Sequence, residues 1–462
     1  MNLVGRYRKN EFIPDGTAKE YVVDGDIDAE GAVTVTVWGE EKAEGTDFTV
    51  NRENRTVTFS AAPAKAEVGV EGAVIIKFPC TPEGYEEKIA KCRIMTSYGV
   101  GSNDRLFFAG NPDFPNVDWH SGLNDPTYIP DLSYATVGIE ATAIMGYLRV
   151  GEYLAVVKED NGQDSTIFLR SGSLDESGQA VFSLRQSVAG VGAVARGTFG
   201  SLLDDPLFLS GTGVCAVTTN MLTTEKIAQN RSFFVNAKLV NEPGLENAVA
   251  TQWMGMYVLC VNGNVYVLDG RQQKTYRSES LGDFVYECYF WDNVPAVSLM
   301  RRREGDEEML YFGTADGRIC RFNTDVETLD RFSDDGEAID AVWATKADDD
   351  GDPSMLKTMI KKGNCVTLKP YNRSSAEICF RTDRDTVDWL AKKDTIDIFD
   401  WGEIDFSRLS FDSNDGPREI MFQTKVKKYK RLQILIRNKT ANEGFGVFGI
   451  VKHYVVGNFA KQ

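Results

Sequence analysis

The sequence predicts an all-β protein, in which a β-propeller carries a small Ig-like β-sandwich near its N-terminus and a second β-sandwich at its C-terminus. Three observations lead to this fold class. The 462 residues include 42 glycines among abundant Val, Thr, Phe and Tyr, a composition typical of short strands joined by turns. A strand–turn–strand pattern recurs about every fifty residues. Segments of alternating apolar and polar residues lie on both sides of that repeat.

The repeat is clearest in EYLAVVKEDNGQDSTIFLR, DPLFLSGTGVCAVT, MYVLCVNGNVYVLDG and EMLYFGTADGRICRFN. Each reads as a β-hairpin with Gly, Asn or Asp at the turn. A fifth segment, RLFFAGNPD, has the first strand but a longer loop in place of the turn. When the segments are aligned on Leu106, Leu154, Leu207, Val258 and Leu310, the spacings are 48, 53, 51 and 52 residues. Helical repeats are disfavoured because the 3.6-residue periodicity is missing.

Further strands complete each unit. The segments TAIMGYLRV, GAVARGTF, NAVATQWM and PAVSLMRR precede the last four hairpins, and SFFVNAKLV (232–240) and FVYECYFWD (284–292) supply a fourth strand. Four strands and about fifty residues per unit are the signature of propeller blades. We therefore predict a propeller of five or more blades over residues 80–343.

The flanking segments have a different pattern. Residues 12–79 alternate apolar and polar positions between short turns, which predicts a small antiparallel sandwich. Residues 1–11 are predicted to be a leader or the remnant of an earlier segment. Residues 344–462 contain further alternating strands and predict the C-terminal sandwich.

Composition and charge argue against several classes of function. The formal net charge of −17 argues against a broad surface for nucleic acid or anionic membranes. The start MNLVGRYRKN lacks the apolar core of a signal peptide, and no run of 18 apolar residues predicts a membrane span. The eight cysteines are dispersed without a CxxC motif, which favours buried reduced thiols.

We find no catalytic or cofactor motif. The two histidines, His120 and His453, lie in different predicted domains, and no GxSxG, HExxH, Walker or Rossmann pattern occurs. We therefore predict no enzymatic activity and no cofactor, although paired carboxylates serve propeller glycosidases. The acidic stretch Asp348–Asp350 is interpreted as an exposed linker, with a bound cation as the alternative.

The stretch GNPDFPNVDWHSGLNDP (110–126) suggests a rigid loop. Its three prolines restrict the backbone, and its Asn and Asp residues favour turns that bond their own main chain. Trp119 and Tyr128 can anchor the loop, and we predict that they support an interface between blades or between protomers. His120 is predicted to be a structural hydrogen-bond donor.

The segment KVKKYKRLQILIRN has a basic first half and an apolar second half. Its cations are Lys425, Lys427, Lys428, Lys430 and Arg431. They could contact DNA or an acidic protein, or they could simply prevent aggregation at an exposed edge strand. The residue pattern leaves these alternatives open.

Several segments together resemble a known family. They are NDRLFFAGNPDFPNVDWHSGLNDPTYIPDLSYATVG, NRSFFVNAKL, NVYVLDG, VYECYFWDNVPA, MLYFGTADGRICRFN and WATKADDDGDPSMLKTMIKKG. They resemble the phage stabilisation proteins encoded by phages and prophages of gut Firmicutes, over about residues 80–462. In architecture these are similar to the tail hub, or nozzle, proteins of short-tailed phages, in which a β-propeller carries β-sandwiches.

The resemblance implies a structural virion protein made in the host bacterial cytoplasm. Such a hub forms a ring, commonly a hexamer, between adaptor or portal proteins and distal tail proteins. It helps to retain packaged DNA and lets DNA pass without sequence-specific binding and without a membrane partner. The basic strand would then contact an acidic partner surface. The alternatives are a receptor- or glycan-binding tail protein and, less favoured, a propeller glycan hydrolase.

Overall fold

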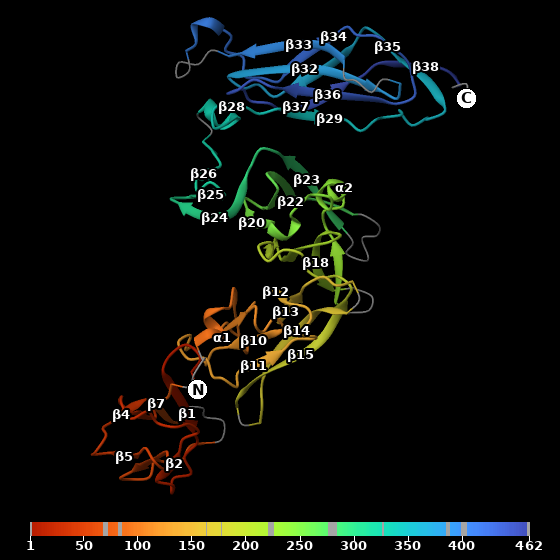
Figure 1. Ribbon diagram of the computed structural model, residues 1–462. Coiled ribbons are helices and arrows are strands. Elements are labelled where there is room, and N and C mark those ends of the chain that lie inside the picture. Colours follow the sequence, from red (N-terminus) through yellow and green to blue (C-terminus); the bar gives the residue numbers. More distant parts are fainter. Residues whose placement is uncertain are drawn as a thin grey trace. The chain divides into compact units, whose positions relative to one another are not determined.

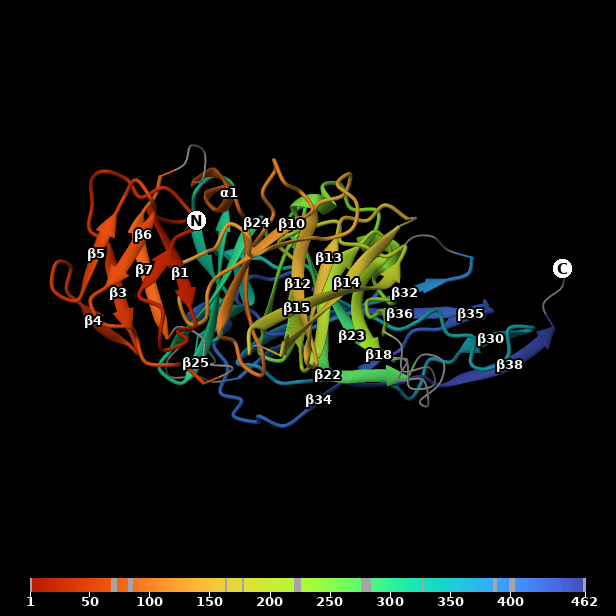
Figure 2. The same ribbon diagram turned by 90° about the horizontal axis from the view of Figure 1, so that it is seen from below.

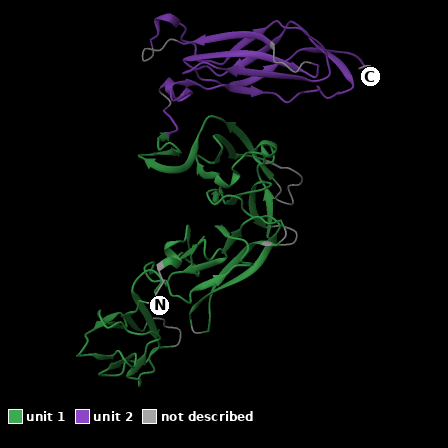
Figure 3. Cartoon of the chain, in the orientation of Figure 1, with its two compact units in different colours: residues 1–320 green, residues 321–462 purple. Residues whose placement is uncertain are grey.

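The computed structural model divides the chain into two compact units, Met1–Cys320 and Arg321–Gln462 (Figure 3). It describes residues 2–67, 73–81, 86–162, 164–176, 178–219, 226–275, 284–325, 328–384, 389–398 and 404–459. Strands make up 53% of the structure and helices 4%, which confirms the all-β class. Within the described residues, no helix has the length and apolar character that crossing a membrane requires.

The N-terminal sandwich consists of two antiparallel sheets, ordered β1-β7-β3-β4 and β2-β6-β5 (Figure 1). Its strands are β1 (Tyr7–Phe12), β2 (Glu20–Val22), β3 (Thr34–Val37), β4 (Glu40–Lys42), β5 (Phe48–Asn51), β6 (Thr56–Phe59) and β7 (Val74–Pro79). Alternate apolar residues of both sheets, such as Val35, Val57 and Ile76, are fully buried between them. Strand β1 pairs with β7 along its whole length. Residues 7–11 thus pair with the last strand of this sandwich.

Five further antiparallel sheets follow in unit 1, and in each of them consecutive strands are neighbours, as in propeller blades (Figures 1 and 2). The first blade follows a short helix, α1 (Glu86–Ala90), and contains β8 (Ile94–Tyr98), β9 (Arg105–Ala109), β10 (Val117–His120) and β11 (Tyr134–Thr136). The second contains β12 (Ile144–Val150), β13 (Tyr153–Lys158), β14 (Ser165–Leu174) and β15 (Ala180–Ala189). The third contains β16 (Gly200–Leu202), β17 (Asp205–Ser210), β18 (Gly213–Thr219) and β19 (Lys226–Asn230).

The fourth blade contains β20 (Val249–Trp253), β21 (Met256–Val261), β22 (Asn264–Thr275) and β23 (Phe284–Trp291). The fifth is three-stranded, with β24 (Ala296–Glu304), β25 (Glu307–Thr314) and β26 (Ile319–Arg321). The five residues used to align the sequence repeat all fall on the second strand of their sheets, so one repeat corresponds to one blade. In the β21–β22 hairpin, Asn262 and Gly263 both have positive φ, 51° and 74°, as a two-residue turn of this kind requires.

Consecutive blades pack through apolar faces. One buried cluster combines Phe107 of the first blade with Leu154 of the second. Another combines Ala155 of the second blade with Phe208 of the third. A third cluster joins the third blade to the fourth. Because the second, third and fourth blades are covered by their neighbours, their middle strands β13, β17 and β21 are buried on both faces, which explains the nearly continuous apolar sequences of these strands.

Two predicted strands have a different structure. In GAVARGTF, strand β16 begins only after the segment, at Gly200. In SFFVNAKLV, residues 236–239 form the short helix α2 (Asn236–Leu239), and the fourth strand of that blade is the preceding KIAQN. The side chain of Ser232 donates a hydrogen bond to Asn236 Oδ1 (2.5 Å) and its hydroxyl accepts one from the backbone N–H of Val214 (2.8 Å). These local bonds favour a turn over a strand. The short helix η1 (Leu245–Asn247) follows.

Unit 2 is a β-sandwich with three main sheets, ordered β29-β36-β32-β33, β35-β30-β38 and β34-β31-β37. Its elements are η3 (Leu329–Phe332), β27 (Ser333–Asp334), β28 (Glu337–Ala338), β29 (Ala341–Ala344), β30 (Met355–Met359), β31 (Asn364–Leu368), β32 (Arg373–Thr382), β33 (Trp389–Asp397), η4 (Phe406–Arg408), β34 (Arg418–Phe422), β35 (Val426–Tyr429), β36 (Leu432–Asn438), β37 (Val447–Val451) and β38 (Tyr454–Phe459). Strand β29 pairs with β36, and the unit begins at Arg321. The C-terminal sandwich thus begins before residue 344, which was the start predicted from the sequence.

Candidate interaction surfaces

The segment 110–126 is a strand between two tight connections, and not the single long loop that the sequence predicted. Val117–His120 forms β10 and pairs with β9 and β11. On one side, Asn111 Oδ1 accepts a hydrogen bond from the backbone N–H of Asp113 (2.9 Å). On the other, Asp125 Oδ1 accepts one from the backbone N–H of Thr127 (3.1 Å). Such side-chain to main-chain bonds fix the two connections, as their composition predicted.

Trp119 is a core residue. Only 3% of its surface is exposed, and it packs in a small cluster with Leu3 and Ile129. The ring of Phe114 meets the indole edge-on at 5.8 Å. Trp119 thereby holds the N-terminal segment against the first blade. Within one chain the indole is almost completely covered, and its support of an interface between blades or between protomers stays a prediction.

Tyr128 connects the N-terminal sandwich to the first blade. Its half-buried hydroxyl donates a hydrogen bond to the backbone oxygen of Lys9 on β1 (2.6 Å). The Lys9 ammonium lies 5.3 Å from the centre of the tyrosine ring. Burial raises the pKa of Tyr128 above its usual range. The interface at Tyr128 is thus an internal contact of unit 1.

His120 is a hydrogen-bonded side chain within an aromatic cluster. Its Nδ1 lies 3.0 Å from the backbone oxygen of Ser121, and its ring contacts Phe107 and Phe182. Burial lowers the pKa of His120, so the ring is neutral near pH 7. A cavity of about 480 Å³ lies beside it, also lined by Lys9, Arg105, Tyr128 and Gln179.

A buried ion pair joins the first blade to the second. Arg170 on β14 donates two hydrogen bonds to Asp118 on β10, at 2.6 and 2.8 Å, and both side chains are 1% exposed. Tyr147 donates a third hydrogen bond to Asp118 (3.0 Å), and the guanidinium lies 4.8 Å from the centre of the Phe107 ring. Burial alone would lower the pKa of Arg170, but the charge and hydrogen bonds of Asp118 raise it.

A similar arrangement joins the third blade to the fourth. Arg231, 1% exposed, donates to Asp205 Oδ2 (2.7 Å) and to the backbone oxygen of Phe284 (2.9 Å). Tyr286 of the fourth blade also donates to Asp205 (3.2 Å). Asp205 follows Asp204 in the sequence, and instead of forming a free carboxylate pair it bonds an arginine and a tyrosine of this cluster. Arg170 lies within β14, directly after the apolar run Ile167–Leu169, and this change from apolar to charged residues is the sequence signal for the Asp118–Arg170 pair.

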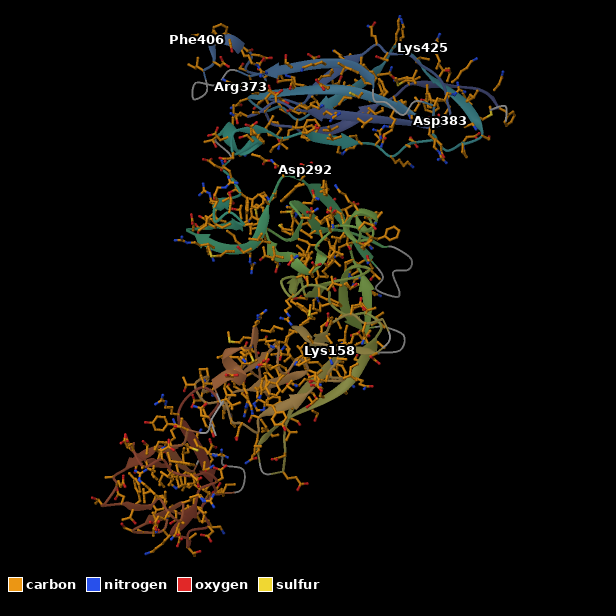
Figure 4. The ribbon with its side chains drawn as sticks, in the orientation of Figure 1. Lys158, Asp292, Arg373, Asp383, Phe406 and Lys425 are labelled. Carbon is orange, nitrogen blue, oxygen red and sulfur yellow. The ribbon has the colours of Figure 1, made fainter. Side chains whose placement is uncertain are left out.

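The basic segment KVKKYKRLQILIRN forms two strands in two sheets and not one. Strand β35 is the edge of the sheet β35-β30-β38, whereas β36 lies inside the sheet β29-β36-β32-β33. Asp383 fixes the break between them by accepting hydrogen bonds from the backbone N–H groups of Lys430 (2.8 Å) and Arg431 (3.2 Å). Figure 4 shows Asp383 and Lys425 in the C-terminal unit.

The five predicted cations of this segment are all exposed: Lys425, Lys427, Lys428, Lys430 and Arg431. None of them forms an ion pair with a carboxylate in the part of the chain that the structure describes. Lys428 has a positive φ of 53°, and the pairing register with β30 shifts there, so β35 carries a bulge. The structure thus gathers the basic residues on an irregular edge strand.

The acidic stretch Asp348–Asp350 is paired with a lysine. The Lys452 ammonium lies 2.5 Å from Asp350 Oδ1 and 3.6 Å from Asp348 Oδ2. Both the backbone N–H and C=O of Asp348 bond Leu432. The sequence left a bound cation at Asp348–Asp350 as an alternative, and in the structure the ammonium group of Lys452 lies at these carboxylates. Across the described residues, no group of three or more His, Cys, Asp and Glu side chains is placed to hold a metal ion.

The sequence matches no family model and no curated protein. Among solved structures, an exo-β-1,3-galactanase from Phanerochaete chrysosporium is similar in two forms, a point variant with β-1,3-galactotriose and a complex with galactose. Each is 8% identical, covers 97% of this chain and 100% of its own, and has a TM-score of 0.19. A TM-score this low supports no inference about this chain.

Proposed function

We propose that this chain is a structural protein of a phage virion, a tail hub or nozzle component that assembles into a ring, commonly a hexamer. The proposal rests on the sequence resemblance given above. The fold is compatible with this role, because along the chain five blade-like sheets lie between two β-sandwiches, an architecture built for contacts with other proteins rather than around a catalytic site. In this role the chain would contact adaptor or portal proteins on one side and distal tail proteins on the other.

The observation that favours this role most is the uneven distribution of charge. Unit 1 contains 28 Lys and Arg against 44 Asp and Glu, whereas unit 2 contains 23 against 24. Nearly all of the net charge of −17 therefore belongs to the sandwich and blades of unit 1. An acidic wall repels the phosphate backbone, so DNA can pass without being held.

The test is whether the chain is part of assembled particles. Particles from a producing host are purified, and their proteins are quantified by mass spectrometry together with cryo-EM of the tail. We expect a fixed, stoichiometric number of copies around the DNA path. A chain that is absent from particles and stays monomeric after purification would overturn the proposal. Binding to host saccharides by the isolated chain would instead favour the receptor-binding alternative.

A further inference from the structure

Seven exposed cations gather at one end of the C-terminal sandwich, the end marked by Lys425 in Figure 4. Five of them belong to the segment around β35, and Lys361 and Lys362 follow the adjacent strand β30. Met359 of β30 pairs with Val426 of β35, which places these two lysines beside Lys425. We call the seven residues the basic surface: Lys361, Lys362, Lys425, Lys427, Lys428, Lys430 and Arg431.

The charges of the basic surface are not neutralised by ion pairs with any carboxylate in the described ranges. Asp383 contacts this surface through the backbone N–H groups of Lys430 and Arg431. Other cations of the same unit are paired, such as Lys452 with Asp350. Like charges that are held together repel one another and destabilise the folded state. The basic surface therefore indicates an anionic partner.

Protection of a sheet edge does not account for the whole basic surface. A bulge and one or two lysines suffice to prevent a further strand from adding, and β35 has both, with its bulge at Lys428 and Lys427 next to it. The other five members lie outside β35, in connections between strands. Strand β38, the opposite edge of the same sheet, is exposed along its whole length and carries no charged side chain. The number of cations thus exceeds what edge protection requires.

The composition of the basic surface distinguishes between kinds of anionic partner. Six of its seven members are lysines, and the apolar residues of β35, Val426 and Tyr429, are buried, with 4% and 0% of their surface exposed. Interfaces between proteins are depleted in lysine and depend on aromatic and apolar anchors. Interfaces with nucleic acid are more polar and much more positively charged. A row of lysines without an apolar anchor therefore favours a phosphate backbone over an acidic protein.

We propose that the basic surface binds the phosphate backbone of DNA without regard to base sequence. Residues 425–431 span up to about 20 Å, and a duplex presents about twelve phosphate charges over that length of its axis. Lysine meets phosphate as a point charge, and contacts to phosphate carry no sequence information. The inference rests on the proposed function for its role: unit 1 repels DNA, and a weak contact with unit 2 helps to retain it.

The salt dependence of binding measures the number of phosphate contacts. Each contact contributes about −0.9 to the slope of log K against log salt concentration, so five contacts give a slope of about −4.5. Between about 50 and 200 mM salt the affinity should then fall about 500-fold. Fluorescence anisotropy of a labelled DNA duplex of mixed sequence, titrated with the full chain over this range, gives the slope.

The experiment compares three variants of the full chain. Lys427→Gln removes one charge of the basic surface, and Lys425→Gln with Lys427→Gln removes two. Lys439→Gln is the matched control: Lys439 is also exposed and forms no ion pair within the described residues, but it follows Asn438 at the other end of β36, where Asn438 bonds Ser375. Circular dichroism and thermal melts verify that each variant keeps its fold.

We expect the parent and the control to bind DNA equally. The single variant should lower the magnitude of the slope by about 0.9 and the double variant by about 1.8, and the double variant should bind at least about tenfold more weakly at about 50 mM salt. A parent that does not bind DNA at that salt concentration, or variants that bind like the control, would overturn the inference. Tighter binding to phosphatidylserine vesicles or to polyglutamate, lost in the double variant, would overturn it in favour of a membrane or an acidic protein.

Particle analysis separates this inference from the proposed function. If the purified chain binds DNA through these lysines but is absent from particles, the contact stands and the virion role fails. If the chain is found in particles but the parent does not bind DNA, or the variants bind it like the control, the virion role stands and the contact fails.

Discussion

Removing one partner of the buried pair Asp118–Arg170 should open the interface between the first two blades. Both side chains are 1% exposed, and two hydrogen bonds of 2.6 and 2.8 Å join them. Asp118→Ala leaves a buried guanidinium without its carboxylate, and breaking a buried pair in this way costs about 3–5 kcal/mol. Arg170→Met leaves the carboxylate with a hydrogen bond from Tyr147 and should cost a similar amount.

The double variant provides the decisive comparison. With both charges removed, no unpaired ion is buried, so Asp118→Ala with Arg170→Met should be clearly more stable than the sum of the two single changes predicts. Native-state hydrogen exchange of peptides covering β10 and β14 measures the local opening free energy. The exposed pair Asp316–Arg318 serves as control, and Asp316→Ala should leave exchange unchanged. Additive single effects, or an Asp118→Ala variant as stable as the control, would refute this reasoning.

Three further predictions concern other buried groups. Trp119→Ala should destabilise the first blade by about 3–5 kcal/mol, since the indole fills the contact with Leu3, and should speed hydrogen exchange near the N-terminus; unchanged exchange there would contradict the packing. The pKa of His120 is lowered by burial, so the unfolded chain takes up a proton near pH 6.5 while the folded chain does not, and stability falls as pH drops below that value. His120→Asn should flatten this dependence in denaturation curves between pH 7.5 and 5.5, and an equal slope in both proteins would argue against it. Lys158 (Figure 4) is 1% exposed, and burial lowers its pKa to about 8, so stability should rise between about pH 8 and 10.5, where the unfolded lysine still holds its proton. Lys158→Met should remove that rise, as denaturation at pH 7.5, 9 and 10.5 would show.

The succession of blades was predictable because a hairpin has a recognisable local sequence pattern. A turn such as Asn262-Gly263 between two apolar runs specifies a hairpin, and its repetition specifies the blade. The wrong strand predictions are of two kinds. In the first, local side-chain hydrogen bonds compete with strand formation, as at Ser232. In the second, a segment becomes a strand only by pairing with a partner far away in the sequence. Strand β1 is of the second kind, because only its pairing with β7 places it in the sandwich.

The candidate surfaces were harder to predict than the fold. The composition around Trp119 predicted ordered connections but not the burial of the indole, which depends on Ile129 and on Leu3, a residue far from it along the chain. The basic segment read as one strand, because the break at Lys430 is stabilised by Asp383, which is 47 residues away. The exposure of all six residues of β38 had no signal in the sequence, since YVVGNF would suit a buried strand equally well.

The charged residues serve two separate purposes in this chain, and burial distinguishes them. Arginines such as Arg170 and Arg231 are buried between blades, where each bonds an aspartate and contributes nothing to the surface field. Other charges are divided by region: unit 1 has an excess of acidic residues, and exposed cations gather at and beside β35 in unit 2, namely Lys425, Lys427, Lys428, Lys430 and Arg431. Buried pairs bond only at short range, whereas exposed clusters of opposite sign attract across a solvated gap of about a screening length. Raising the salt concentration should therefore screen the exposed charges and leave the buried blade-to-blade pairs Asp118–Arg170 and Asp205–Arg231 intact.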